Sequence, residues 1–387
     1  MRVLVSGASI AGPAVAFWLC RSGFEVTVVE KAATVRSGGY PIDVRGTALE
    51  VVRRMGLLPR LQAADVATRR LTFLNTDGSV AASVHPQHVV GGVDGEDLEI
   101  RRGDLTDVLH AAVREDVEFV FGDSIEVLDE RADGVHVTFR SGAERDFDLV
   151  VGADGLHSRT RELVFGPELE FHRYLGFCFA GFTMPNTFGL SHEGVMWNAP
   201  GKGAILYGVE DGETVHGFLN LACPRPPMEL LRDPEAQRAM VAEAFAGHGW
   251  ETPAMVEAMQ VADDLFFDTV SQIRMPAWSR GRAVLVGDAA HAPSFLTGQG
   301  SSLALVGAYM LAHALTTHAD HTAAFTAYEA STREFVELNQ ALVGEGDAVL
   351  FPTTAEELET RNAGLRSLTG ELPETGRVEH SALTLPG

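Results

Sequence analysis

The sequence predicts an α/β protein: a Rossmann-like domain that is interrupted by a β-sheet domain and followed by a C-terminal helix. Residues 2–30 show the order strand, helix, strand, which is typical of a parallel βαβ unit. Two later apolar runs, residues 149–151 and 283–286, each lead into a turn that contains Gly and Asp, as strands do at the ligand-binding edge of a parallel sheet. Between them, residues 170–222 contain short β-type runs separated by Gly, Pro and Asn, which indicates an antiparallel sheet.

The remaining elements divide the chain into these units. Helical spacing is expected at residues 47–56, 105–113, 234–245 and 254–260, and a long helical stretch is expected after Gly300. We therefore assign residues 1–67, 100–168 and 262–315 to the Rossmann-like domain, 68–99 and 169–261 to a substrate domain, 316–345 to a C-terminal bridging helix, and 346–387 to a C-terminal extension. The end of this extension is expected to be a frayed tail, because it is polar and carries Pro and Gly.

Composition limits the classes of partner. The chain has 387 residues and a formal net charge of −23, and so acidic a surface disfavours nucleic acid and anionic lipid. No uncharged apolar run approaches a membrane span, and no signal peptide precedes the first strand, so we expect a cytoplasmic protein without membrane contact. The three cysteines lack metal or redox spacing, and no metal site is expected.

The first chemical motif is the turn from Gly7 to Gly12. Gly7 permits a tight turn after the first strand, and Gly12 lets the helix pack closely on the sheet. The start of the helix offers free N–H groups to a pyrophosphate, and Glu30 can accept hydrogen bonds from ribose hydroxyls. Ser9 stands where a second glycine is usual. The motif alone does not separate FAD from NAD, and a strand–helix turn without a ligand remains an alternative.

Two further motifs follow apolar strands. The first is Gly152-Ala153-Asp154-Gly155, which precedes a polar, basic segment. The second is Gly287-Asp288-Ala289-Ala290-His291, which is followed by Gly298-Gln299-Gly300. Asp288 is placed to accept hydrogen bonds from sugar-like hydroxyls, and its alternative role is that of a helix N-cap.

Taken together, in this order and at these distances, the three motifs resemble the flavin-dependent aromatic hydroxylases of the para-hydroxybenzoate hydroxylase type. Within that class the chain looks most like the compact tetracycline-inactivating and antibiotic-pathway monooxygenases, over roughly residues 1–345. The resemblance implies non-covalent FAD that is reduced by transiently bound NAD(P)H. It also implies O₂ addition at flavin C4a, and a hydroperoxide that hydroxylates or epoxidises a small aromatic or polyketide-like substrate.

The resemblance also assigns roles to residues. The first motif would hold the ADP half of FAD, Gly287-Asp288 the ribityl chain, and Asp154-Gly155 the pyrophosphate and the approach of NAD(P)H. Arg102 would lie near the pyrophosphate and ribityl chain, and the loop of Asp43 and Arg45 near the isoalloxazine. The expected cofactor-binding residues are Gly7, Ser9, Ile10, Ala11, Gly12, Glu30, Lys31, Asp43, Arg45, Arg102, Asp154, Gly155, Gly287, Asp288, Pro293, Gly298, Gly300, Ser301 and Ser302.

The reacting pocket is expected near Pro293, Gly298, Gln299 and Gly300, and no single catalytic side chain is predicted. A glycine-rich loop that opens a helix points N–H groups at the negative charge of reduced flavin. Related enzymes tend to have Asn where Ser302 stands and an acid where Gly307 stands. The first departure bears on a side-chain contact to the flavin, and the second removes a carboxylate from the helix face.

Other residues and functions remain open. His291 is more easily explained as structural, whereas His172, Tyr174, Tyr207 and His216 either line the substrate pocket or are ordinary sheet residues. A flavin oxidase or an NAD(P)H-dependent reductase is the alternative function. A flavin halogenase lacks support because no Trp-x-Trp pair occurs, and a non-catalytic flavin carrier is a further alternative. The expected partners are a small-molecule substrate and O₂, with the protein as monomer or homodimer.

Overall fold

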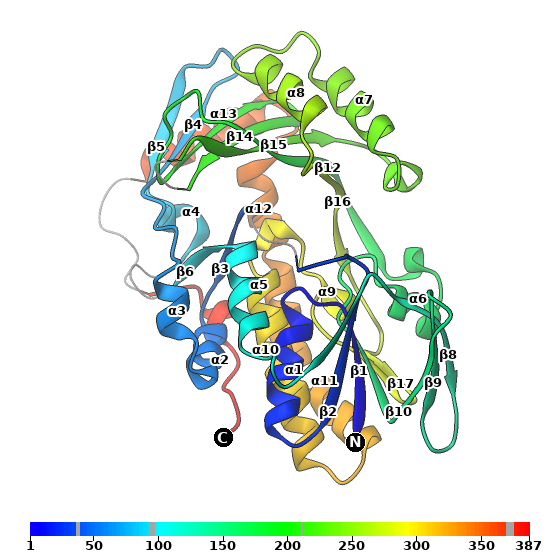
Figure 1. Cartoon of the computed structure of the whole chain (residues 1–387). Coiled ribbons are helices and arrows are strands. Elements are labelled where there is room, and N and C mark those ends of the chain that lie inside the picture. Colours follow the sequence, from blue (N-terminus) through cyan, green and yellow to red (C-terminus); the bar gives the residue numbers. More distant parts are fainter. Residues whose placement is uncertain (36–38, 93–96, 210–211, 369–374) are drawn as a thin grey trace.

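The computed structural model describes residues 1–35, 39–92, 97–209, 212–368 and 375–387, which form two lobes (Figure 1). One lobe is built on a six-stranded sheet, with the strand order β17-β18-β11-β1-β2-β7. Its strands are β1 (Arg2–Ser6), β2 (Glu25–Glu30), β7 (Glu118–Phe121), β11 (Leu149–Gly152), β17 (Ser279–Arg280) and β18 (Ala283–Leu285). All neighbouring pairs are parallel except β17 with β18. The α/β prediction is confirmed.

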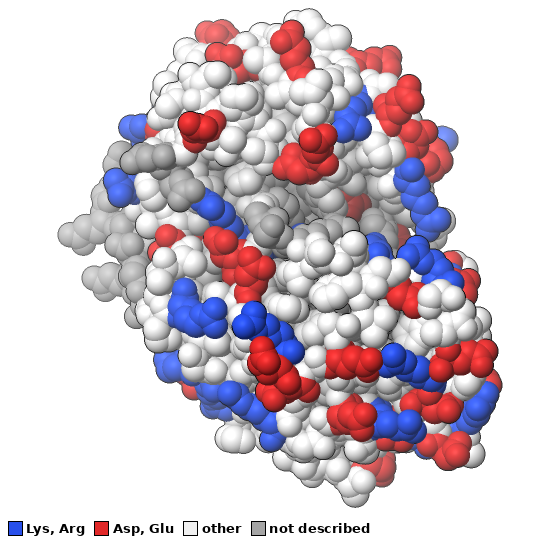
Figure 2. Space-filling model, viewed as in Figure 1, with Lys and Arg blue, Asp and Glu red and all other residues white. Residues whose placement is uncertain are grey.

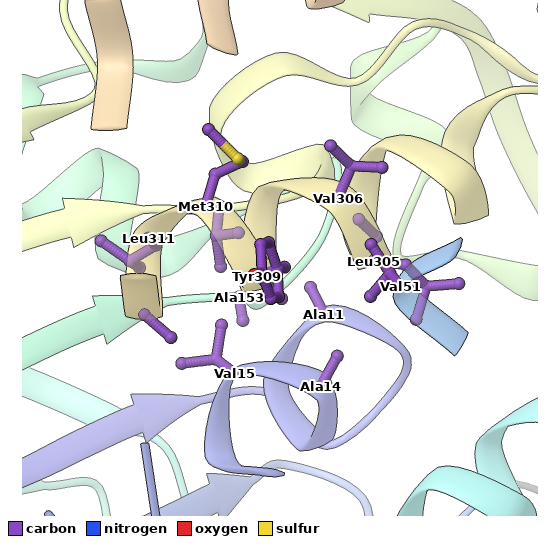
Figure 3. Packing of buried hydrophobic residues seen from close by; sticks show 14 of the residues in the cluster. Ala11, Ala14, Val15, Val51, Ala153, Leu305, Val306, Tyr309, Met310 and Leu311 are labelled. Atoms are coloured by element: carbon purple, nitrogen blue, oxygen red, sulfur yellow. The ribbon is translucent and has the colours of Figure 1, made fainter. Parts of the chain in front are cut away.

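The core of this lobe lies between helices α1 (Ala11–Arg21) and α10 (Gly300–Thr317) and the sheet. In Figure 3, Ala11, Ala14 and Val15 of α1 face Leu305 and Tyr309 of α10. The small side chains on α1 let the two helices approach each other, and α10 is buried over most of its length. This packing fixes the first turn of α1 beside the first turn of α10.

Smaller elements complete this lobe. A two-stranded ribbon of β3 (Pro41–Val44) and β6 (Leu98–Arg101) stands beside α10, and β8 (Ile125–Glu130), β9 (Val135–Phe139) and β10 (Glu144–Phe147) form a separate three-stranded sheet. Its short helices are α2 (Thr47–Met55), α3 (Leu58–Gln62), α5 (Arg102–Ala111), α6 (Arg159–Phe165) and α9 (Asp288–His291), whereas α4 (Gln87–Val90) packs through Val89 on the second lobe.

The second lobe is a seven-stranded sheet in the order β16-β12-β15-β14-β13-β4-β5, and only the β13–β4 pair is parallel among its described strands. Its strands are β4 (Arg70–Leu74), β5 (Val80–Val84), β12 (His172–Pro185), β13 (Glu193–Ala199), β14 (Lys202–Gly208), β15 (Thr214–Ala222) and β16 (Phe266–Ile273). β16 comes from the range 262–315 that we assign to the first domain, and the domain limits stay a prediction.

The side chains on each strand of this sheet alternate between two faces. One face packs on α7 (Pro234–Phe245) and α8 (Thr252–Val261), and it includes Ala204, Leu206 and Leu219. The neighbouring residues on the same strands must therefore face the other way, towards the six-stranded lobe, as Figure 1 shows for the sheet as a whole. We call this second side the inner face.

The C-terminal region is more ordered than the sequence predicts. After α11 (His321–Ala341) come α12 (Val343–Leu350) and α13 (Ala355–Ser367). The expectation of a frayed tail is wrong for residues 375–387, which return to the first lobe, where His380 and Leu385 are buried. Backbone carbonyls accept hydrogen bonds there, which a polar composition does not reveal. Among the described residues, no helix combines the length and apolar character needed to cross a bilayer.

Candidate functional site

The turn between β1 and α1 is as tight as its glycines suggest. Gly7 has φ +106°, and a Cβ there would lie 2.4 Å from the carbonyl oxygen of Ala153. A Cβ on Gly12 would lie 1.9 Å from the carbonyl oxygen of Gly7. Ile10 is the N-cap of α1, and no side chain caps the helix. The first N–H groups of α1 are therefore left for a ligand, and an anion suits them.

Glu30, at the end of β2, supports this turn. Its Oε2 accepts a hydrogen bond from the amide of Ala8 at 2.9 Å, and its Oε1 accepts one from the amide of Ala32 at 2.8 Å. Each carboxylate oxygen keeps a second lone pair, so ribose hydroxyls can still be bound. Lys31, the next residue, is exposed.

The carboxylate of Asp154, just after β11, accepts its hydrogen bonds from other residues of the protein. Its Oδ2 accepts hydrogen bonds from the amide and the hydroxyl of Thr160, both at 2.9 Å, and from the hydroxyl of Ser6 at 3.3 Å. Its Oδ1 accepts one from the hydroxyl of Ser158, which caps α6. Asp154 thus ties β1 and β11 to α6. Gly155 next to it has φ +84° and open space where a Cβ would be.

Asp288, at the end of the neighbouring strand, differs. It is half-buried, and its carboxylate accepts no hydrogen bond from any described protein group. Burial raises the pKa of its carboxyl, and the positive charge of Arg102 opposes that rise. Gly287 has φ +61°, and a Cβ there would lie 2.9 Å from the Cβ of Ala11. The Asp288 carboxylate therefore opens into the space between the first turns of α1 and α10, with its acceptor sites free.

Arg102 closes one side of that space. It begins α5, and its Nη2 donates to the hydroxyl of Ser9 at 2.9 Å. Its amide donates to the carbonyl oxygen of Tyr40 at 3.1 Å. The Tyr40 phenol lies close enough to Arg102 and Asp288 for their charges to affect its pKa, which burial raises. The sequence interpretation missed Tyr40, and its place just before the Pro41–Gly46 loop was the available signal.

The segment from Pro293 to Ser302 forms a cradle at the start of α10. Gly298 has φ +64°, and a Cβ there would lie 2.8 Å from Oδ2 of Asp43. Ser301 and Ser302 are buried, and the Ser302 hydroxyl accepts a hydrogen bond from the amide of Arg45 at 3.1 Å. Arg45 pairs with Asp43 at 2.6 Å. The structure thus brings the Asp43–Arg45 loop and the glycine cradle together.

The side chain of Gln299 is fully buried in this cradle, and neither of its amide atoms has a hydrogen-bond partner among the described residues. An unpaired buried amide is costly, so such groups mark places where a ligand or water completes the structure. Together with the free N–H groups of α1 and the free carboxylate of Asp288, this donor and acceptor set fits a bound dinucleotide.

The inner face of the seven-stranded sheet covers the cradle. Phe295, in the cradle loop, packs edge-on against Phe179 of β12 at 4.8 Å between ring centroids, and Tyr40 packs against Phe218 of β15 at 5.4 Å. Figure 2 shows the surface hollowed between the two lobes. Phe179 and Phe218 thus give the cover of the cradle an aromatic lining.

The four candidate sheet residues separate between the two faces. Tyr207 and His216 alternate with residues that pack on α7 and α8, so both lie on the inner face. The hydroxyl of Tyr174 donates to the carbonyl oxygen of Cys223 at 2.7 Å, and its ring packs with the helix-covered face. His172 is the first residue of β12, with its Nε2 at 3.4 Å from the hydroxyl of Thr269.

A charged network near the Asp154 turn also escaped the sequence interpretation. His157 lies between Glu168, at 2.8 Å from Nδ1, and Asp268 of β16, at 2.9 Å from Nε2. Arg161 is buried and contacts Glu168 at 3.1 Å. Burial lowers the pKa of His157, but hydrogen bonds and charge from both carboxylates outweigh it and raise the pKa to about 9. The network joins the first lobe to the edge of the covering sheet.

His291 and Gly307 have structural explanations. Burial lowers the pKa of His291 to about 3, and the ring packs 4.7 Å from that of Trp278. A Cβ at Gly307 would lie 3.3 Å from Val286 and 3.4 Å from the hydroxyl of Tyr328. The space at Gly307 is therefore tight, and a larger side chain would need Val286 or Tyr328 to shift by a few tenths of an ångström.

The last residues of the chain hold the loop beside the cradle. We call residues 378–386 the C-terminal strap. A Cβ at Gly46 would lie 2.1 Å from the carbonyl oxygen of His380, and Thr47 donates to the carbonyl oxygen of Leu383 at 2.8 Å. Tyr309 of α10 donates to that of Pro386 at 2.8 Å. The strap therefore packs directly behind Arg45.

Comparison with known proteins adds the family. The family described as "FAD binding domain" matches residues 1–187 and 228–343. An uncharacterised protein of Mycobacterium tuberculosis is 42% identical over 359 residues, which is 92% of this chain and 96% of that protein. A flavin-dependent monooxygenase from an unknown prokaryote is 38% identical over 366 residues, 93% of this chain and 94% of that protein.

Among solved structures, the tetracycline destructase Tet(55) superposes with a TM-score of 0.85 at 35% identity, covering 100% of this chain and 98% of that one. The likeness extends over both lobes and the C-terminal helices.

Proposed function

This chain belongs to the FAD-binding-domain family and is a flavin-dependent monooxygenase, and from that premise we propose that NAD(P)H reduces its flavin and that it hydroxylates or epoxidises a small aromatic or polyketide-like substrate. When bound, FAD supplies the redox chemistry and the activation of O₂. The protein supplies binding, orientation and the exclusion of water.

Named residues would hold the cofactor in separate parts. The N–H groups at the start of α1 and Arg102 suit the pyrophosphate, and Glu30 suits the adenosine ribose. Asp288 suits the ribityl hydroxyls because its acceptors are free. The first N–H groups of α10 and the loop of Asp43 and Arg45 suit the isoalloxazine, whose reduced form is anionic.

The observation that carries the proposal is the aromatic cover of the cradle. Phe179 and Phe218 would help to exclude water from the cradle, so that oxygen activated by the cofactor is not lost as H₂O₂. The same rings provide flat apolar surfaces for an aromatic substrate. One similar solved structure is that of a tetracycline destructase, and this likeness supports the proposal of a polycyclic substrate for this chain.

The proposal is tested with the holoenzyme and a panel of phenolic and polyketide compounds under ¹⁸O₂. We expect one compound to stimulate NAD(P)H oxidation and to yield a product that carries one ¹⁸O atom. Unlabelled product formed under air, with H₂O₂, would indicate an oxidase. Product formed under strict anaerobiosis would indicate a reductase. Acid precipitation should release FAD into the supernatant; flavin that stays with the pellet would contradict non-covalent binding.

A further inference from the structure

The ribbon of β3 and β6 brings two carboxyl groups together beside the cradle. Asp43 and Glu99 are direct partners in the antiparallel pairing, so their side chains lie on the same face of the ribbon. Asp43 is also the residue that Gly298 must leave room for, since a Cβ on Gly298 would lie 2.8 Å from its Oδ2. The pair is therefore joined to the cradle at one end.

At its other end the pair reaches the covering sheet. The hydroxyl of Tyr207, on the inner face of β14, donates to Oε1 of Glu99 at 2.5 Å. The hydroxyl of Thr68 also contacts both Glu99 and Tyr207. Tyr207 on the inner face thus contacts Glu99, and Glu99 is the cross-strand partner of Asp43 beside the cradle, close enough for the charge of Asp43 to act on it.

The described charges near Asp43 and Glu99 do not neutralise two ionised carboxylates. Arg45 contacts Asp43 at 2.6 Å, and Asp97 adds a further negative charge near Asp43. Burial raises the pKa of Asp43 against the effect of Arg45, and burial and the charge of Asp43 raise the pKa of Glu99. Arg45 itself faces His380 of the C-terminal strap. Two facing carboxyl groups with one adjacent guanidinium favour a state in which the pair keeps one proton.

We propose that Asp43 and Glu99 hold one shared proton, and that Tyr207 passes protons between this pair and a hydroxyl group of the substrate bound under the inner face of the seven-stranded sheet. This inference rests on the proposed function. In the step, the substrate O–H donates its proton to Oη of Tyr207 while the phenol proton moves to the ionised carboxylate of the pair. One proton leaves the substrate and one arrives at the carboxylate, so the substrate becomes an oxyanion and no electrons are exchanged.

The test uses the visible absorbance of FAD in the substrate-free holoenzyme as a function of pH, because a charge at Asp43 lies beside the cradle. Wild type should show a spectral transition at a pH above the usual carboxyl range. Glu99→Gln removes the like charge, so Asp43 should ionise more readily and the midpoint should shift to lower pH. Tyr207→Phe removes a donor that stabilises ionised Glu99, so the midpoint should shift to higher pH.

Opposite shifts in these two variants distinguish proton sharing from a structural role, which would move neither midpoint. Tyr174→Phe is the matched control, because its phenol lies on the helix-covered face and is bonded to Cys223; its midpoint should equal that of wild type. If Glu99→Gln does not fold, Tyr207→Phe decides alone. No transition in wild type, or an unchanged midpoint in Tyr207→Phe, would overturn the proposal.

The outcome is separable from that of the proposed function. An enzyme that incorporates ¹⁸O but shows no transition refutes proton sharing and leaves the monooxygenase. An enzyme with both shifts but no ¹⁸O in its product keeps the proton pair and refutes the oxygenase.

Discussion

Two neighbouring strands are each followed by a turn that contains an aspartate, and the two aspartates have opposite surroundings. Asp154, after β11, accepts four hydrogen bonds from Ser6, Ser158 and Thr160. Asp288, after β18, accepts none from the described protein groups, although it too is half-buried. β11 and β18 are adjacent and parallel, so both aspartates lie at the same edge of the sheet.

The difference shows that a Gly-Asp turn at a strand end has no fixed role. The residues after the aspartate decide that role: Ser158 and Thr160 supply hydroxyl and amide donors close to Asp154, whereas Ala289 and Ala290 supply no side-chain donor to Asp288. Asp154 is therefore satisfied within the protein, whereas the Asp288 carboxylate keeps acceptors that, as we propose, bind the cofactor. The assignment of Asp154 to the FAD pyrophosphate stays a prediction, and its internal hydrogen bonds point to an indirect contribution.

The largest expected effect is on stability. Asp154→Ala leaves buried donors of Ser158 and Thr160 unpaired and removes the link between the sheet and α6. We expect the free energy of unfolding of the apoprotein to fall by about 2–4 kcal/mol, as for the loss of a buried hydrogen-bond network. Urea denaturation measures it. A loss below about 0.5 kcal/mol would show that the network is not structural.

The next effect is on the cofactor. Asp288→Ala removes acceptors for the ribityl hydroxyls, and charge-assisted hydrogen bonds contribute roughly 1.5–3 kcal/mol, so FAD should bind about 10- to 150-fold more weakly. Apoprotein stability should not fall, because the carboxylate has no protein partner to lose. Titration of apoprotein with FAD checks this, and Asp154→Asn serves as the control. Equal loss of affinity in both variants would remove the distinction.

Removal of the C-terminal strap tests whether its contacts with Gly46 and Thr47 help the protein to hold FAD. Removing residues 375–387 uncovers Gly46 and Arg45, and we expect FAD to dissociate several-fold faster. Burial lowers the pKa of His380 to about 4, below its value near 6.5 in an unfolded chain. The contribution of neutral His380 to the stability of the folded chain is complete above pH 6.5 and is lost as the pH falls to about 4. Stopped-flow FAD release should therefore accelerate in that range for wild type but not for the truncated chain.

His157 resembles Asp154 in that its hydrogen-bond partners, Glu168 and Asp268, are residues of the protein. Its pKa of about 9 exceeds the unfolded value near 6.5, so its contribution to stability is complete below pH 6.5 and is lost as the pH rises through 9. His157→Gln should lower the melting temperature at pH 6, and the difference from wild type should shrink by pH 10. A difference that does not change with pH would mean that the ring acts only by packing.

The smallest effect is expected from substitution of Ser9, which has one partner within the protein, Arg102, and lies in the proposed cofactor-binding turn. Its hydroxyl accepts a hydrogen bond from Arg102, and the usual residue at this position of the motif is glycine. Ser9→Gly should change FAD affinity by less than about three-fold, and Ser9→Ala should have less effect than Asp288→Ala. A loss as large as that of Asp288→Ala would mean that Ser9 positions Arg102 for the pyrophosphate.

The sequence predicts the first lobe better than the site that it forms. Gly7, Gly12 and Glu30 are found where a βαβ unit requires them, because this motif is local. The α/β class, the FAD cofactor and the monooxygenase activity follow from motifs of this kind, and they are confirmed.

Contacts between distant segments could not be predicted in this way. Glu99 meets Tyr207 across 108 positions, and Asp268 meets His157 across 111. Neither pair has a spacing signal, because strand register and the approach of the two lobes create them. The strap was missed for a related reason: its carbonyl oxygens make the contacts, and every residue has one.

The measurement that most directly tests the division of roles between the two aspartates is the FAD-induced rise in melting temperature for Asp154→Asn and Asp288→Asn beside wild type. A ligand that binds only the folded state raises the melting temperature according to its affinity. Asp154→Asn should lower the melting temperature with and without FAD and keep the rise that FAD produces. Asp288→Asn should leave the apoprotein unchanged and show a smaller rise. A full rise in Asp288→Asn, or a reduced rise confined to Asp154→Asn, would contradict that division.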